Sequence, residues 1–165
     1  MVAAGLKKTA VLCVLKNNQQ FLLLKRLKEP NKNMYTPVGG KLDPYETPLQ
    51  AALRETMEET GIVLSHMKYC GTLVETSPAD YNWISFVYMA EVEQMPPPNC
   101  NEGVLEWIAF ADVLNVPTPA SDWFIYKYLL QEKIFAFNAV YDAQLQMIYM
   151  QNDLTGEMVI GDLPQ

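Results

Sequence analysis

The chain has 165 residues, half of them hydrophobic, with ordinary glycine and proline content. This length and composition favour one globular domain, residues 1–165, with a sizeable core and no second domain. The formal net charge is −7, so we expect no nucleic-acid polymer as a partner, because an acidic protein repels polyanions. The charge is uneven, since residues 1–42 hold eight lysines and arginines and one acid. A small phosphorylated ligand bridged by cations therefore stays compatible with the sequence.

The three cysteines, Cys13, Cys70 and Cys100, are odd in number and widely spaced. This pattern fits neither a disulfide framework nor a zinc site, and it favours a reducing compartment. The start of the chain has no apolar segment of signal-peptide length, and no run approaches the length of a membrane helix. We therefore expect a cytoplasmic protein without a membrane partner; a homodimer is compatible with the sequence.

Two apolar runs rich in strand-forming residues, 9–16 and 20–27, predict a β-hairpin that turns at Asn17 and Asn18. Residues 28–46 predict a long loop, and a loop of this length in a compact domain is usually functional or disordered. A helix is predicted next because four residues typical of helix ends follow in the expected order. They are Thr47 as N-cap, Pro48 at the first helical position, Gln50 completing a capping box, and Gly61 at the C-terminal end.

The second half of the chain alternates strand and helix patterns. Strands are predicted at 67–75, 83–92 and 105–110, a loop at 95–99, a helix at 121–133 capped by Ser121, and a closing hairpin at 135–150 around Asp142 and Ala143. No internal repeat is present. The order of elements, mostly joined as hairpins, predicts an α+β fold in which a mixed β-sheet is sandwiched between α-helices.

The helix predicted at 47–61 has two unlike faces. At 100° per residue, its packed face is predicted to hold Leu49, Leu53, Met57 and Thr60, and its other face Glu55, Glu58 and Glu59. Glu55 and Glu59 repel each other by roughly 0.2–0.5 kcal/mol in an isolated helix, and only Arg54 offsets this locally. Carboxylates on a rigid helix suit Mg²⁺ or Mn²⁺, and a solvated acidic face is the alternative.

The stretch GGKLDPYETPLQAALRETMEETGI, residues 39–62, resembles the box of the Nudix hydrolases. The matching positions are Gly40, Glu46, Arg54, Glu55, Glu58, Glu59, Gly61 and Ile62. Thr56 departs from the family, which has an aliphatic residue there; we expect its methyl to flank the packed face and its hydroxyl to bond back to the preceding turn. The resemblance covers nearly the whole chain and implies a Nudix fold and hydrolysis of a nucleoside diphosphate linked to another group.

The resemblance also implies roles for the residues of the box. Glu55 and Glu59 correspond to the main metal ligands, Glu58 shares that work or holds a second ion, and the carbonyl of Gly39 resembles the backbone ligand of the family. Four positions look structural: Gly40, Glu46, Arg54 and Gly61. Glu46 and Arg54 are expected to form an ion pair that fixes the loop against the helix, although a surface pair contributes little. Lys41 is placed where it can touch phosphate, with a solvated lysine as the alternative.

The chemistry of such a site follows from charge. A pyrophosphate link resists water because its oxygens are already negative; divalent ions neutralise them and acidify bound water, and a carboxylate removes the proton. The sequence leaves the base open among Glu55, Glu58, Glu59 and a residue outside the box. Glu102, five residues before Trp107, is the outside candidate and is also a candidate metal ligand. A plain loop glutamate is the alternative.

The substrate is less well indicated. The order of strand, helix and aromatic hairpin after residue 105 resembles the Nudix branch that hydrolyses 8-oxo-dGTP, but the stretch that reads the purine edge there corresponds here to PTPA, residues 117–120. That recognition does not carry over. Aromatic residues that could stack on a base, or belong to the core, are Tyr81, Trp83 and Trp123. Basic residues that could hold a triphosphate tail, or form a solvated edge, are Lys25, Arg26, Lys28 and Lys32. The single histidine, His66, has no catalytic partner.

These patterns predict a Mg²⁺-dependent enzyme, with Mn²⁺ as a substitute, that binds a small nucleotide. The predicted reaction converts a nucleoside triphosphate, with 8-oxo-dGTP as a candidate, to the monophosphate and pyrophosphate. One alternative is an ADP-ribose or nucleotide-sugar pyrophosphatase. The other is a non-catalytic Nudix-fold ligand sensor, which is disfavoured because such modules are expected to lose acids of the box and this chain keeps them all.

Overall fold

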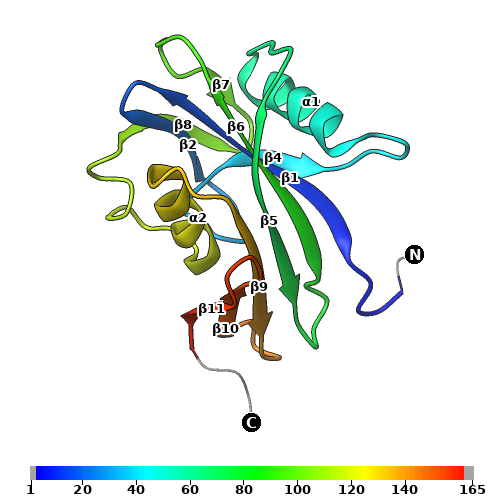
Figure 1. Cartoon of the computed structure of the whole chain (residues 1–165). Coiled ribbons are helices and arrows are strands. Elements are labelled where there is room, and N and C mark those ends of the chain that lie inside the picture. Colours follow the sequence, from blue (N-terminus) through cyan, green and yellow to red (C-terminus); the bar gives the residue numbers. More distant parts are fainter. Residues whose placement is uncertain (1–2, 162–165) are drawn as a thin grey trace.

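The computed structural model describes residues 3–161, so the first two and last four residues of the predicted domain lie outside the described residues. The described part is an α+β fold with one mixed sheet of eleven strands and two helices (Figure 1). The elements are β1 Lys8–Asn17, β2 Gln20–Arg26, β3 Tyr35–Thr36, β4 Val38–Lys41, α1 Pro48–Thr60, β5 Lys68–Thr76, β6 Trp83–Glu91, β7 Asn99–Cys100, β8 Gly103–Ala109, α2 Ala120–Leu130, β9 Phe135–Tyr141, β10 Met147–Asn152 and β11 Glu157–Ile160.

The main path of the sheet has the order β11-β10-β9-β5-β6-β1-β2-β8-β7, with β3 paired to β2 and β4 paired to β1. Two pairs are parallel, β1 with β6 and β5 with β9, and the other pairs are antiparallel. The helices lie on opposite faces of the sheet, α1 at the upper right of Figure 1 and α2 at the lower left. Each helix closes its own apolar cluster, which contains Ala51 and Ala52 on the α1 side and Ile125 and Leu129 on the α2 side. The sandwich predicted from the order of elements is confirmed.

The local signals of the first half are confirmed at the first hairpin and the first helix. β1 and β2 pair around the turn after Asn17, where Asn18 has a positive φ of 49°. The capping box of α1 is complete, because the backbone N–H of Gln50 donates to the Thr47 hydroxyl and the Gln50 side chain accepts from the Thr47 N–H. The helix ends at Gly61, whose φ of 75° is left-handed and suits glycine.

The predicted loop at 28–46 is wrong in part, because it contains β3 and β4. Gly39 and Gly40 lie in β4, which pairs with β1 at Leu12 and Val11. A Cβ on Gly39 would lie 2.0 Å from the carbonyl oxygen of Val11, so this strand approaches β1 too closely for any side chain. The glycines and prolines of this segment were interpreted as loop residues. In the structure, Gly39 and Gly40 allow the backbones of two strands to pack closely.

Three smaller predictions also differ from the structure. Asn99, placed in a loop, begins the short strand β7. Helix α2 begins at Ala120 after Pro119, so Ser121 is inside the helix and caps nothing, and the helix ends at Leu130. Strand β11 follows the closing hairpin, which is itself confirmed, and it was not predicted.

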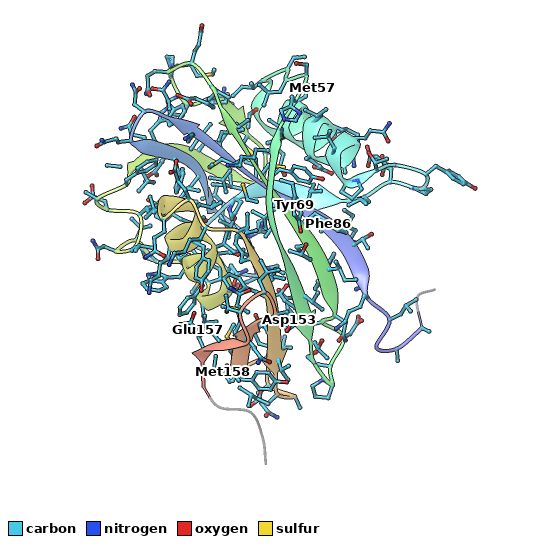
Figure 2. All side chains as sticks on the ribbon, viewed as in Figure 1. Met57, Tyr69, Phe86, Asp153, Glu157 and Met158 are labelled. Atoms are coloured by element: carbon cyan, nitrogen blue, oxygen red, sulfur yellow. The ribbon has the colours of Figure 1, made fainter. Side chains whose placement is uncertain are left out.

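The packed face of α1 is rotated relative to the prediction. Met57 is 44% exposed and lies on the outer side of the helix (Figure 2), whereas Ala51, Ala52, Thr56 and Thr60 are buried. The helix packs closely on β1 and β4, and small side chains fit such a close contact better than methionine. Leu49 and Leu53 stay partly buried against the same cluster.

Thr56 is fully buried, and its hydroxyl donates to the Met67 sulfur at 3.8 Å, not to the preceding turn as expected. A thioether is a weak acceptor, so this hydrogen bond contributes little. We expect Thr56→Val to be neutral or to raise the melting temperature slightly, because valine keeps the shape and removes a poorly satisfied buried hydroxyl. Thermal unfolding of the two proteins measures this, and a fall of about 5 °C or more would contradict it.

Two negative predictions concern the described residues only. Cys13, Cys70 and Cys100 are all free, as their spacing predicted. Neither helix within residues 3–161 has the length and apolar character needed to cross a membrane.

Candidate active site

A cavity opens where β1 and β2 diverge. The end of β1, from Leu15 to Asn17, pairs with β2, while residues 10–13 pair on the same edge with β4. The insertion of β4 separates the two strands on the α2 side of the sheet. The resulting cavity has a volume of about 370 Å³ and is lined by β1, β3, β4, β5, β6 and the start of α2, together with Arg26 and Glu102.

Glu59, near the end of α1, contacts a residue of the cavity lining. Its carboxylate accepts a hydrogen bond of 2.9 Å from the backbone N–H of Gly39, which lines the cavity. The pKa of Glu59 is raised to about 7, chiefly by burial; the negative charges of Glu102 and Glu55 act in the same direction, whereas the Gly39 hydrogen bond and the charge of Arg26 oppose the shift. A carboxylate held under these conditions gains strongly from a nearby cation.

Arg54 ties the other acids of the helix to the loop before it. Its guanidinium donates to both carboxylate oxygens of Glu46, at 2.8 and 2.9 Å, and to the carbonyl of Lys41 at 3.0 Å. The remaining nitrogen reaches Glu55 at 2.8 Å and Glu58 at 3.2 Å. The pair of Glu46 and Arg54 is thus bidentate and clamps the segment after β4 onto α1.

Glu55 also approaches β4 directly. A Cβ on Gly40 would lie 2.4 Å from the Glu55 carboxylate, so glycine leaves the space that this side chain occupies. Within residues 3–161, no three acidic, histidine or cysteine side chains already surround a single point as a finished metal site. The oxygen donors of Glu55 and Glu59 are close to β4 but engaged with Arg54 and Gly39.

Glu102 reaches the cavity from the turn between β7 and β8. Its side chain is 56% exposed and pairs with Arg26 at 3.8 Å, and Arg26 also donates to the carbonyl of Pro30. Of the four basic residues singled out in the sequence, only Arg26 lines the cavity. Lys25 lies over the Tyr35 ring, and the exposed Lys28 and Lys32 are outside the lining.

The aromatic candidates divide between the cavity and the remainder of the molecule. Trp83 and Tyr81 line the cavity, and the ammonium group of Lys41, also in the lining, lies 5.9 Å from the centre of the Trp83 ring. Trp123 does not line it; its indole N–H donates to the carbonyl of Leu114. His66 is exposed and lies outside the lining.

Four buried polar residues of the cavity were missed in the sequence. Thr36, Glu75, Ser85 and Asp122 come from β3, β5, β6 and α2, and the buried Ser121, which the sequence predicted only as a helix cap, also lines the cavity. The available signal was an acid at the end of an apolar strand, LVE, and another at the start of an apolar helix, SDWFIYKYLL. Such acids are rarely buried without a reason, but nothing in the chain order places these two at one site.

The geometry therefore combines a clamped acidic helix, a glycine strand and a cavity beside them. The sequence model of the NUDIX domain matches residues 6–131, well over half of the chain. The chain belongs to the Nudix family. Its α1 is the Nudix helix, and residues 40–62 form the Nudix box. As a Nudix hydrolase it acts on diphosphate-linked nucleotides, and Nudix enzymes typically use a divalent metal.

Among curated relatives, an uncharacterized Nudix hydrolase of Bacillus subtilis, YvcI, is 26% identical over 124 residues, which cover 72% of this chain and 77% of the relative. A protein of Proteus vulgaris named 8-oxo-dGTP diphosphatase is 34% identical over 90 residues, or 54% of this chain and 75% of that protein. Among solved Nudix structures, the MutT protein of Bacillus halodurans superposes with a TM-score of 0.78 at 25% identity, covering 89% of this chain and 98% of that one. These similarities support a Nudix pyrophosphohydrolase.

Proposed function

We propose that the protein is a Mg²⁺-dependent pyrophosphohydrolase that cleaves a nucleoside triphosphate to the monophosphate and pyrophosphate. The observation that carries this proposal is a cavity whose lining residue Gly39 contacts Glu59 of the Nudix helix, and which has Arg26, Lys41 and several buried polar groups in its lining. Such a cavity suits a ligand with a polyanionic end and a flat polar end. The similarity to the Proteus vulgaris enzyme makes 8-oxo-dGTP one candidate.

The oxygen donors around β4 fit a hard divalent cation. We propose that Glu55, Glu59 and the carbonyl of Gly39 hold it, with Glu58 and Glu102 as additional ligands. When bound, Mg²⁺ neutralises phosphate charge and lowers the pKa of a coordinated water. Arg54 keeps the acids of the helix in register with β4 through its contacts with Glu46, Glu55 and Glu58.

The other residues of the cavity have separate tasks in this proposal. Arg26 and Lys41 bind phosphate oxygens, and Trp83 offers a ring face for stacking, steadied by the cation beside it. A glutamate carboxylate accepts the proton of the attacking water. Glu102 is suited to this because it lines the cavity, is half exposed and is held loosely by Arg26.

A substrate panel tests the proposed reaction. With dGTP, 8-oxo-dGTP, the other nucleoside triphosphates and ADP-ribose assayed in Mg²⁺, we expect a triphosphate to be cleaved with the highest kcat/KM, because Arg26 and Lys41 favour the longer polyanion. Chromatography should identify the monophosphate and pyrophosphate. A clear preference for ADP-ribose, giving AMP and ribose phosphate, would replace the triphosphate assignment, and tight binding without turnover would support a ligand sensor.

Glu102→Gln isolates the contribution of the residue outside the box. If Glu102 is the base, kcat should fall at least about tenfold while the melting temperature stays unchanged, because the side chain is exposed and makes only a long ion pair. Steady-state kinetics and thermal unfolding measure the two quantities. An unchanged kcat returns the role of base to Glu55, Glu58 or Glu59.

A further inference from the structure

A second cavity lies at the other end of helix α2. The helix borders the first cavity with Ser121 and Asp122 at its start, and it borders the second cavity with Leu129 near its end. The second cavity has a volume of about 260 Å³, and its walls include the ends of β1 and β6 and the start of β5. The two linings share no residue, so the second cavity is separate from the proposed active site.

Part of the wall of the second cavity is apolar. Leu129 and Cys70 are buried members of the core cluster on the α2 side of the sheet, and Met89 packs against that cluster. Ile134, after the end of α2, also lines the cavity but is 64% exposed and belongs to neither core cluster. An apolar group that enters this cavity is therefore removed from water against existing apolar side chains.

Three lysines share the same lining. Lys16 is half-buried at the end of β1, and Lys68 and Lys133 are exposed at the start of β5 and after α2. Within residues 3–161, none of these three ammonium groups has a carboxylate oxygen within 4.0 Å. Glu91 and Glu132 also line the cavity, which leaves it with more positive than negative side chains.

The charges of these lysines act inside the cavity. Burial raises the pKa of the Cys70 thiol, and the positive charges of Lys68 and Lys16 oppose that rise. The protein as a whole has a net charge of −7, so an excess of positive charge around a cavity is a local exception. Neighbouring ammonium groups that lack acid partners repel one another, and a bound anion relieves this repulsion.

We propose that the second cavity binds a small organic phosphate monoester, with its phosphate among the three lysines and its apolar body against Leu129, Cys70 and Met89. A phosphate dianion suits three flexible ammonium groups, because lysine binds phosphate as a point charge without the fixed geometry of arginine. The volume of about 260 Å³ lies below the usual range for ligand pockets, roughly 300–1000 Å³, so we expect the body to be one ring or a short chain. This inference does not depend on which nucleotide the first cavity takes.

Three probes separate the two halves of the site. Phenyl phosphate carries both the charged head and the apolar body, inorganic phosphate carries the head alone, and benzyl alcohol has the ring without the charge. Each is titrated into the full chain in metal-free buffer, which weakens phosphate binding at the Nudix helix, and two-dimensional amide NMR spectra are recorded.

We expect phenyl phosphate to shift the amide signals of Cys70, Ala90 and Lys133, which line the second cavity. The signals of Gly39 and Gly40, in the first cavity, should stay unchanged. Phenyl phosphate should bind at least about tenfold more tightly than inorganic phosphate or benzyl alcohol, because only this probe combines the ring with the charge.

Two substitutions, Lys16→Met and Lys68→Met, remove one charge each and keep most of the length of the side chain. Each should weaken the binding of phenyl phosphate at least about threefold and change the affinity for benzyl alcohol less than about twofold. Lys28→Met, at an exposed position outside both cavities, is the matched control and should change neither affinity by more than about twofold. Thermal unfolding checks that all three variants fold.

Four results would overturn the inference. Phenyl phosphate could shift no signal at all, or shift only signals of the first cavity, which would place its phosphate at the Nudix helix. Inorganic phosphate could bind as tightly as phenyl phosphate, which would leave the apolar wall without a role. Finally, Lys28→Met could lose as much affinity as Lys68→Met, which would reduce the lysines to general surface charge. The substrate panel tests the proposed function by turnover, so either proposal can fail without the other.

Discussion

Glu59→Gln should lower kcat at least about a hundredfold, as expected for the loss of a direct metal ligand. Glu59 is the acid of the Nudix helix that accepts a hydrogen bond from the β4 backbone, from the N–H of Gly39, which lines the cavity. The amide of glutamine can still accept that hydrogen bond but brings no charge for the cation. Glu55→Gln should have a similar effect on kcat, and a chelator should abolish turnover by the wild type. Steady-state kinetics over a range of Mg²⁺ concentrations measure these changes.

The fold should survive the Glu59→Gln substitution. Burial raises the pKa of Glu59 to about 7 in the absence of metal, so removing the carboxylate takes away an unfavourable charge. In metal-free buffer the melting temperature of the variant should equal or exceed that of the wild type. Glu93→Gln, at an exposed position beyond β6, is the control and should change neither quantity. Full activity of both Glu59→Gln and Glu55→Gln would remove the helix from the metal site.

Asp122→Asn should stabilise the protein, and the gain should grow with pH. Burial, with the charge of Glu75 as the second cause, raises the pKa of Asp122 to about 8, while the unfolded chain titrates near 3.9. Between these values the folded state binds the extra proton, so the stability of the wild type falls as the pH rises from about 4 to about 8. Asparagine has no such penalty. At pH 7.5 in metal-free buffer we expect a gain on the order of 2–4 kcal/mol, visible as a higher melting temperature.

The pH series provides the decisive comparison. Below a pH of about 3.9 the Asp122 carboxyl is mostly protonated in both states, so the stabilities of the wild type and Asp122→Asn should converge as the pH falls toward that value. Asp112→Asn should follow the wild type throughout, because Asp112 is exposed. A destabilised Asp122→Asn at pH 7.5 would show that the carboxylate is charged and well paired in the folded protein. A gain in stability at pH 7.5 that disappears toward a pH of about 3.9 would identify Asp122 as a carboxyl group that is largely protonated in the folded protein.

The features predicted best from the sequence are those determined by residues close together in the chain. The capping box at Thr47 and Gln50, the stop at Gly61 and the ion pair of Glu46 with Arg54 all lie within one short segment, where spacing translates directly into geometry. The rotation of α1 was missed because periodicity places a stripe on a helix but does not fix which edge of the stripe meets the sheet. In the structure, alanine and threonine side chains of α1 are buried against the sheet, and Met57 is exposed.

The buried polar groups of the cavity were missed for a different reason. Thr36, Glu75 and Asp122 are far apart in the chain and become neighbours only through the pairing of β3 with β2, β5 with β6, and the packing of α2 on the sheet. Each residue alone has an ordinary setting in the sequence. The strand at Gly39 and Gly40 was hidden similarly, since the need for glycine there comes from β1 and from Glu55, not from a turn.

The Nudix box and the buried polar residues of the cavity come from different parts of the chain. The box is one continuous segment, from β4 to the residue after α1, whereas Thr36, Glu75 and Asp122 come from β3, β5 and α2. Substitutions at these three positions can therefore accumulate without disturbing the clamp that Arg54 forms within the box. In a scaffold divided in this manner, evolution can change the ligand specificity while the hydrolysis of the phosphate bond stays the same. Directed evolution toward a new nucleotide should begin at positions 36, 75 and 122 and leave the segment from 39 to 61 untouched.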